Sequence, residues 1–266
     1  MWVELLGAYE RELVAGNIAQ SSRALRLYHL RRFACDHAEV APAEVTRAML
    51  IDWLAGHDWA AETRRSYRAS LRRFFGWARA AGHLEADPAV TLPMIKPPRA
   101  LPRPAPDTAV AAGLAGAEAR VRLMIELLAA TGLRRGELAR VHSSDVLPDL
   151  EGYALRVLGK GGHVRVVPLP NRLARQITAA EGYVFPGAID GHLSARRVGE
   201  LVSAALPDGW TAHTLRHRFA TRAYAASHDL RAVQELLGHA KPETTAIYTL
   251  VQPDRLRAVA AAAWAA

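Results

Sequence analysis

The stretch YALRVLGKGGHVRVVPL, residues 153–169, decides the fold class that we expect for this chain. Its two halves, Tyr153–Leu158 and His163–Leu169, are rich in apolar and β-branched residues, and the turn Gly159–Gly162 joins them. This pattern predicts a β-hairpin. Because the sequence on both sides shows apolar residues at helical spacing, we expect a mainly α second half that contains a small β-sheet (α+β).

Helices are predicted on both sides of this hairpin from the spacing of apolar residues. Before the hairpin they cover residues 107–115, 118–131 and 135–141. After it they cover residues 171–180, 194–206, 213–226, 229–237, 242–249 and 253–263.

Residues 1–90 show helical patterns alone, which predicts an all-helical first domain. The expected helices cover residues 1–15, 22–38, a segment from a Thr46 cap to Leu54, and residues 61–81. The last of them carries a core stripe, namely Tyr67, Leu71, Phe74 and Ala78. A row of arginines lies on a different face, namely Arg65, Arg68, Arg72 and Arg79. This row is either a contact surface for the DNA backbone or an ordinary solvated helix face.

A proline-rich segment separates the two halves of the chain. Seven prolines lie between Asp87 and Pro106, and such a run resists both helix and sheet. We therefore place a first domain at residues 1–90, a linker at 91–106 and a second domain at 107–266. Since the linker contains Lys96 and Arg99, we expect it also to lie along an anionic partner.

The charge balance favours a polyanion as partner. The chain has 34 Lys and Arg residues against 26 Asp and Glu residues, a formal net charge of +8. Its single cysteine, Cys35, excludes an intramolecular disulfide framework and a cysteine-based zinc module. The sequence has no apolar run of about 18 residues and no secretory pattern, so we expect a cytoplasmic protein without membrane contact.

The segment TGLRRGEL, residues 131–138, puts an arginine at the start of a helix. Gly132 is expected to end one helix, and Arg134 to begin the next. A cation is unfavourable at the positive end of a helix unless an anion binds there, so Arg134 is a candidate phosphate ligand. The alternative is an ordinary ion pair between Arg134 and Glu137.

Lys160 is expected at the tip of the hairpin. The chain has only three lysines, Lys96, Lys160 and Lys241, against 31 arginines. A lysine at this position therefore indicates a need for a titratable ammonium, since an arginine does not release its proton near neutral pH. The alternative is a solvated turn lysine.

The segment HTLRHRF, residues 213–219, opens a helix on which His213 and Arg216 project together. His213 and His217 are four residues apart, a spacing that also suits a metal ion. Because no carboxylate cluster lies nearby, we expect no metal site and interpret His217 as a structural or supporting residue. Further along, His239 follows a helix that ends at Gly238, and Tyr248 lies nine residues beyond it.

Together these segments resemble the tyrosine recombinase family, which includes phage integrases and Xer-type recombinases. The motifs are TGLRxxEL at residues 131–138, GKG at 159–161, HxxRHxFAT at 213–221, LLGH at 236–239 and TTxxY at 244–248. The helical first half and the proline-rich linker extend the resemblance over the whole chain. One departure is Ser143, where the family often has a bulky residue, and it concerns packing alone.

The resemblance implies a site-specific DNA recombinase. Tyr248 would attack a DNA phosphodiester, form a 3′-phosphotyrosyl link and release a 5′-hydroxyl, and Lys160 would protonate the leaving oxygen. Arg134 and Arg216 would clamp the non-bridging oxygens of the phosphate.

Two histidines complete the implied set. His239 would donate a further hydrogen bond to the phosphate, and His213 would either assist proton transfer or orient the phosphate. With so much fixed positive charge the expected reaction uses no metal, and the phosphotyrosyl link makes strand exchange nearly isoenergetic without ATP.

The resemblance also implies a two-domain clamp around duplex DNA, with a SAM-like helical core-binding domain and a catalytic domain. The expected DNA contacts are Arg65, Arg68, Arg72, Lys96 and Arg99. We expect paired recombination half-sites as substrate, assembly to a tetramer on the nucleoid DNA, and accessory proteins as further candidate partners. The terminal segment 254–266 is expected as a helix on a neighbouring protomer or on its own domain.

Other functions would share parts of this pattern. A type IB topoisomerase or a telomere resolvase would use the same site, but the compact two-domain length argues against both. From another class, the chain could be a catalytically silent DNA-binding regulator, although Tyr248 and its expected partners are all present.

Overall fold

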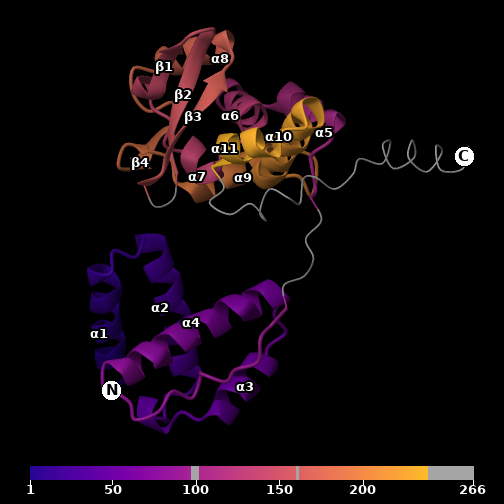
Figure 1. Cartoon of the computed structure of the whole chain (residues 1–266). Helices are drawn as coiled ribbons and strands as arrows, with labels where there is room; N and C mark the ends of the chain where they lie inside the picture. The colour runs from indigo at the N-terminus through magenta and orange to yellow at the C-terminus, as the bar shows by residue number, and fades with distance from the viewer. Residues whose placement is uncertain (97–101, 160–161, 239–266) are drawn as a thin grey trace, which may run out of the picture. The chain divides into compact units, whose positions relative to one another are not determined.

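The structure, a computed structural model, describes residues 1–96, 102–159 and 162–238 (Figure 1). The chain divides into two compact units, Met1–Ala100 and Leu101–Ala266, and each has a hydrophobic core of its own. Helices dominate both units, as expected. The helices predicted at 242–249 and 253–263, and the tip of the hairpin, lie outside the described residues.

The first unit is helical throughout its described part. Its elements are α1 (Trp2–Ala15), α2 (Gln20–Asp36), the 3-10 turn η1 (Pro42–Glu44), α3 (Arg47–Ala55) and α4 (Ala61–Ala80). Thr46 caps α3 as predicted, since its hydroxyl accepts a hydrogen bond from the Met49 amide at 3.3 Å.

Helix α4 forms the centre of this unit, because it packs against α1, α2 and α3. Its predicted stripe is confirmed, and Tyr67, Leu71, Phe74 and Ala78 are all buried. Phe74 also contacts the rings of Trp2 and Tyr9, so the aromatic residues of α1 and α4 share one core.

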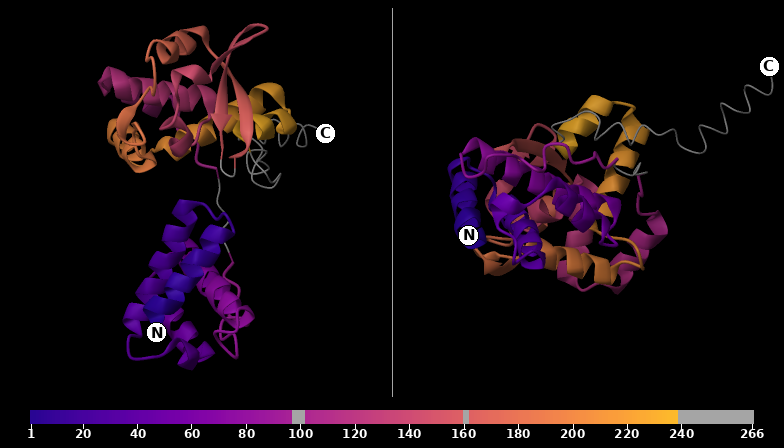
Figure 2. Two further views of the ribbon diagram at one scale, coloured as in Figure 1. Left: turned by 90° about the vertical axis from the view of Figure 1, so that its left-hand side faces the viewer. Right: turned by 90° about the horizontal axis from the view of Figure 1, so that it is seen from below.

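The second unit combines a helical core with a small sheet. Its helices are α5 (Asp107–Gly116), α6 (Ala119–Thr131), α7 (Arg135–Leu138), α8 (Asn171–Thr178), α9 (Ala195–Ala205), α10 (Ala212–Ser227) and α11 (Leu230–Leu237). Helix α6 is central, because it contacts α5, α7, α9, α10 and one strand of the sheet. Figure 2 shows α10 and α11 packed together beside it.

The sheet contains the predicted hairpin and one strand more. Strands β2 (Gly152–Leu158) and β3 (Val164–Leu169) pair antiparallel, with Leu155 opposite Val167. Helix α8 packs on β2 and on β1 (Figure 1). Two strands were not predicted from the sequence: β1 (Val146–Asp149), at the edge of this sheet, and β4 (Pro186–Ile189), a short strand outside it.

Some predicted bounds need correction. The helix expected at 135–141 is the single turn of α7, because the chain turns at Ala139 into η2 (Ser143–Asp145). Among the residues that the structure describes, no helix is long and apolar enough to cross a membrane.

Candidate active site

The site is built where α6 ends against α10. Gly132 closes α6 in the left-handed conformation, with φ of 64°. A Cβ atom at this position would collide with the Phe219 ring on α10, so the contact requires glycine as well as the turn. The chain then turns into α7, of which Arg134 is the N-cap residue.

Arg216 ties three segments together from inside the unit. It lies on the first turns of α10, it is buried, and its guanidinium donates to the Gly132 carbonyl. A second N–H donates to the Leu237 carbonyl at 2.7 Å, near the end of α11. The buried guanidinium therefore links the end of α6 to the end of α11.

Three arginines converge on the C-terminal end of α11. Each donates to one of three successive carbonyl groups: Arg165 Nε to Leu236 at 2.8 Å, Arg216 Nη2 to Leu237 at 2.7 Å, and Arg134 Nη2 to Gly238 at 3.2 Å. The last carbonyls of a helix lack partners within the helix and carry partial negative charge, so cations are favourable there. Two candidate phosphate ligands, Arg134 and Arg216, are thus held on neighbouring carbonyl groups.

Glu137 holds two of these arginines, Arg165 and Arg134, through its carboxylate. Its side chain is 3% exposed, and it forms a bidentate ion pair with Arg165, at 3.0 and 2.7 Å. It also accepts from the Arg134 guanidinium at 2.7 Å and from the Arg134 amide at 2.8 Å. Burial raises the pKa of Glu137, but hydrogen bonds from Arg165 and Arg134 outweigh burial and lower it to about 2.

The ion pair with Glu137 leaves part of the Arg134 guanidinium accessible to solvent. The Arg134 side chain is still 39% exposed. The two interpretations of Arg134 are therefore compatible, because the carboxylate orients a guanidinium that solvent, and an anion in solvent, can reach.

His213 and His217 face each other on α10. Their Nε2 atoms are 2.9 Å apart, and the His217 Nδ1 atom accepts from the Arg103 amide at 3.3 Å. Burial, together with the charges of Arg216, Arg135 and Arg134, lowers the pKa of His213. Burial, His213 and Arg216 lower the pKa of His217 to about 4.

Three of the six predicted catalytic residues have described positions, and the structure brings them together: Arg134, His213 and Arg216. Lys160, His239 and Tyr248 lie outside the described residues. Helix α11, which precedes His239 and Tyr248 in the chain, reaches the arginine cluster through its last carbonyls. Gly159, which precedes Lys160, lies near Glu137, since a Cβ atom built on it would be 3.7 Å from Glu137 Oε1. Among the described residues, no group of three or more His, Cys, Asp or Glu side chains is arranged to hold a metal ion.

The predicted DNA contacts of the first unit differ in their surroundings. Arg65 pairs with Glu62 at 2.7 Å, and Arg68 is half-buried and donates to the Leu92 carbonyl at 2.7 Å. Arg72 is exposed. The pKa of Arg68 is lowered by the burial of its own side chain and by the nearby charge of Arg72. Lys96 is exposed, and Arg99 lies outside the described residues.

Arg165 belongs to the site but was not predicted from the sequence. It lies on β3, its side chain is 9% exposed, and it binds both Glu137 and the end of α11. A signal was present, because a lone charged residue interrupts the apolar run of β3, and a buried charge needs a partner.

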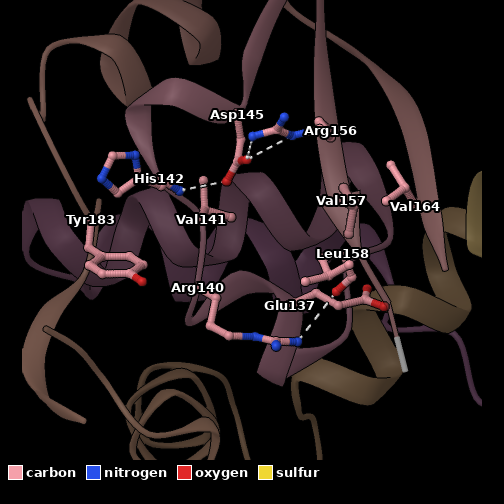
Figure 3. Close-up of a pocket in the computed structure, with 10 residues that line it drawn as sticks. All are labelled: Glu137, Arg140, Val141, His142, Asp145, Arg156, Val157, Leu158, Val164 and Tyr183. Atoms are coloured by element: carbon pink, nitrogen blue, oxygen red, sulfur yellow. Dashed lines mark hydrogen bonds and ion pairs between the residues drawn. The ribbon is translucent and has the colours of Figure 1, made fainter. Parts of the chain in front are cut away.

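A hollow lies beside Glu137, between η2 and the sheet (Figure 3). Arg140 donates there to the carbonyls of Gly136 and Leu158, and Arg156 pairs with Asp145 at 3.0 Å. None of the three predicted catalytic residues with described positions, Arg134, His213 and Arg216, lines this hollow, so we locate the candidate active site at the arginine cluster.

Comparison with known proteins identifies the family of the chain. Residues 108–255 match the family described as the phage integrase family. The chain is 35% identical over 246 residues to tyrosine recombinase XerC of Mycobacterium tuberculosis, covering 81% of the chain and 82% of that protein. It is 36% identical over 209 residues to XerC of Corynebacterium glutamicum, covering 71% of the chain and 67% of that protein.

Solved structures share the fold. The XerH site-specific recombinase bound to a palindromic difH substrate superposes with a TM-score of 0.73 at 21% identity, over 92% of this chain and 80% of that one. A lambda integrase dimer bound to a COC′ core site gives a TM-score of 0.73 at 20% identity, over 92% of this chain and 76% of that one.

Proposed function

The chain belongs to the phage integrase family of tyrosine recombinases and is a site-specific DNA recombinase, and from this premise we propose that the arginine cluster at the end of α11 binds the DNA phosphate that is cut. In this proposal Arg134 and Arg216 donate to the non-bridging oxygens. A phosphodiester gains charge on these oxygens in the transition state, and each preorganised donor is worth about 10²–10³ in rate.

The arrangement of the two arginines supports this role. Both guanidiniums donate to neighbouring backbone carbonyls, and Glu137 fixes Arg134 further. Their geometry is therefore set by the protein before DNA binds, which is what electrostatic preorganisation requires.

The chemical step is assigned to residues that the family motifs identify. We propose that the Tyr248 hydroxyl releases its proton to water and that its oxygen attacks phosphorus while the bond from phosphorus to the 5′-oxygen breaks. Lys160 gives that oxygen a proton, and His239 donates a hydrogen bond to the phosphate. The released 5′-hydroxyl, from the same or another strand, then attacks the 3′-phosphotyrosyl link and frees the tyrosine. Because the proposed charge stabilisation comes from protein cations, the proposed reaction has no step that uses a metal ion or ATP.

The proposed division of labour follows the sequence. Residues 1–90 form a core-binding domain, 91–106 a linker, and 107–266 the catalytic domain, and the two domains grip duplex DNA. The proposed backbone contacts are Arg65, Arg68, Arg72, Lys96 and Arg99. Strand exchange needs paired half-sites, so we propose a tetramer on DNA in the cytoplasm, with accessory proteins as candidate partners.

One observation carries the proposal: segments from α7, β3 and α10, far apart in the sequence, place three arginines on the end of α11, immediately before the LLGH motif ends. The test is a pool of nicked duplexes that are randomised over the half-sites, so that cleavage traps the protein on DNA. The parent protein should give a covalent adduct on a denaturing gel, and Tyr248→Phe should give none. Tyr224→Phe, a tyrosine of α10, is the matched control and should react like the parent. Equal adduct from Tyr248→Phe would contradict the proposal.

A further inference from the structure

His217 lies beside the proposed site, and the mechanism above gives it no role. It faces His213 across one turn of α10, with ring centroids 4.3 Å apart and Nε2 atoms 2.9 Å apart. A contact between two ring nitrogens at this distance needs one proton between them, so one nitrogen donates and the other accepts.

The backbone of Arg103 decides which nitrogen donates. Its amide lies 3.3 Å from His217 Nδ1, and a backbone N–H can only donate. Nδ1 of His217 must therefore accept, and its ring proton must be on Nε2. Consequently His217 Nε2–H donates to Nε2 of His213.

The same logic fixes the second ring. Because Nε2 of His213 accepts, the proton of a neutral His213 is on Nδ1. A protonated His213 would direct an N–H at the N–H of His217, so the contact also selects the neutral form of His213.

We infer that His217, held by the Arg103 amide, is a positioning residue that fixes His213 as the neutral tautomer protonated on Nδ1. The catalytic consequence rests on the proposed function: His213 presents an N–H donor to the phosphate and does not act as a proton acceptor for the nucleophile. Of the two roles that the sequence left open for His213, this assigns the orientation of the phosphate.

The surrounding charges favour the same protonation states. Burial and the cations Arg216, Arg135 and Arg134 lower the pKa of His213, although part of this residue faces solvent. Burial, His213 and Arg216 lower the pKa of His217 to about 4. These are the charged groups on α7 and α10 that act on the pair among the described residues, and at neutral pH they leave both rings neutral.

The tautomers can be read directly in the full-length protein without DNA. Long-range proton–nitrogen spectra of protein labelled with ¹⁵N-histidine distinguish a protonated from an unprotonated ring nitrogen. His213→Gln and His217→Gln assign the two rings. We expect a proton on Nδ1 of His213 and on Nε2 of His217 near pH 7. The opposite pattern, or rapid averaging of both tautomers at His213, would overturn the inference.

A matched pair of variants tests the role of the amide. Arg103→Pro removes the N–H, whereas Arg103→Ala removes the same side chain and keeps the N–H. Residue 103 precedes Pro104, so its backbone is already biased towards extended conformations that proline tolerates. Arg103→Ala should leave both tautomers unchanged, and Arg103→Pro should release His217 and His213 to mixed tautomers. Identical spectra for the two variants would contradict the inference.

The pKa of His213 separates positioning from packing. On a duplex selected by the parent protein, His217→Phe should lower the cleavage rate about 2- to 12-fold, the range of one hydrogen bond. It should also raise the pKa of His213 in a pH titration of the ¹⁵N-labelled protein, because His213 loses the donor that favours its neutral form. His217→Gln keeps an N–H near Nε2 and should restore the pKa of His213, and His228→Asn, at the C-cap of the same helix, should not change it. A rate loss in His217→Phe with an unchanged pKa of His213 would show a packing role only.

These readouts keep the two claims apart. If the spectra show the expected tautomers while His213→Gln cleaves at the parental rate, the tautomer stands and the proposed function of His213 fails. If His213→Gln abolishes cleavage while the spectra show Nε2–H on His213, the proposed function stands and the inference about His217 fails.

Discussion

Replacing Glu137 by glutamine is expected to destabilise the second unit strongly, in a way that depends on pH. The substitution keeps the size of a side chain that is 3% exposed, but it removes the charge that faces Arg165 and Arg134. Two guanidiniums at the centre of the site then lose their shared carboxylate. Breaking a buried ion pair by removing one partner typically costs about 3–5 kcal/mol.

The pKa of Glu137 gives an independent magnitude. It falls from 4.5 to about 2 in the folded protein. At 1.36 kcal/mol per pKa unit, the charged carboxylate contributes about 3 kcal/mol to the free energy of unfolding at pH 7. Because the folded pKa is depressed, this contribution is complete well above pH 4.5 and is lost as the pH falls towards 2. About 2 kcal/mol of it should remain at pH 3.5.

The assay is urea unfolding of the full chain. The readout is hydrogen exchange of peptides from α6, which reports on the second unit alone. The free energy of unfolding of the parent minus that of Glu137→Gln should be about 3 kcal/mol at pH 7 and about 2 kcal/mol at pH 3.5. Glu200→Gln, which removes an exposed carboxylate that pairs with Arg196, is the control and should unfold like the parent. A difference that does not change with pH, or no difference at all, would refute the network as described.

Three further outcomes follow from other contacts. Arg165→Lys keeps the charge but loses the bidentate pair with Glu137, so single-turnover cleavage should fall about 10- to 100-fold, the scale of one hydrogen bond between charged groups; a parental rate would remove Arg165 from the site. Gly132→Ala puts a Cβ against Phe219 and a non-glycine residue in the left-handed region, so thermal unfolding of the second unit should show a loss of at least about 1 kcal/mol. Arg72→Ala should reduce the slope of log K against log salt for duplex binding by about 0.9, measured by fluorescence anisotropy, and an unchanged slope would exclude a phosphate contact.

The hairpin was predictable because its information is local. Alternating apolar residues and a glycine-rich turn specify β2 and β3 without reference to the rest of the chain. Strand β1 was not, since its four residues include Pro148 and show no regular alternation. It exists because β2 offers it an edge to pair with, and an edge strand is where a proline is tolerated.

In the candidate site, too, the local contacts were predictable from the sequence and the long-range contacts were not. The ion pair between Arg134 and Glu137 is a contact over three residues at a helix start, so the spacing contained both partners. The contact of Arg165 with Glu137 joins residues 28 positions apart, and that of Arg134 with the Gly238 carbonyl joins residues 104 apart. Nothing in a single sequence specifies such pairs, and here the packing of α6, α10 and α11 creates them.

Burial is the other property that the sequence did not reveal. His213 and Arg216 were expected to project together, yet the structure leaves His213 exposed and buries Arg216 against backbone carbonyls. A periodic pattern assigns side chains to faces of a helix, but only the tertiary structure shows which polar face the neighbouring elements cover.

The central claim is that this chain cuts DNA by joining it to Tyr248. The most direct measurement is mass spectrometry of the adduct trapped on a nicked duplex, after digestion of both protein and DNA. The account predicts a nucleotide attached through its 3′-phosphate to the peptide that contains Tyr248. A nucleotide on any other residue, or one attached through its 5′-phosphate, would contradict it.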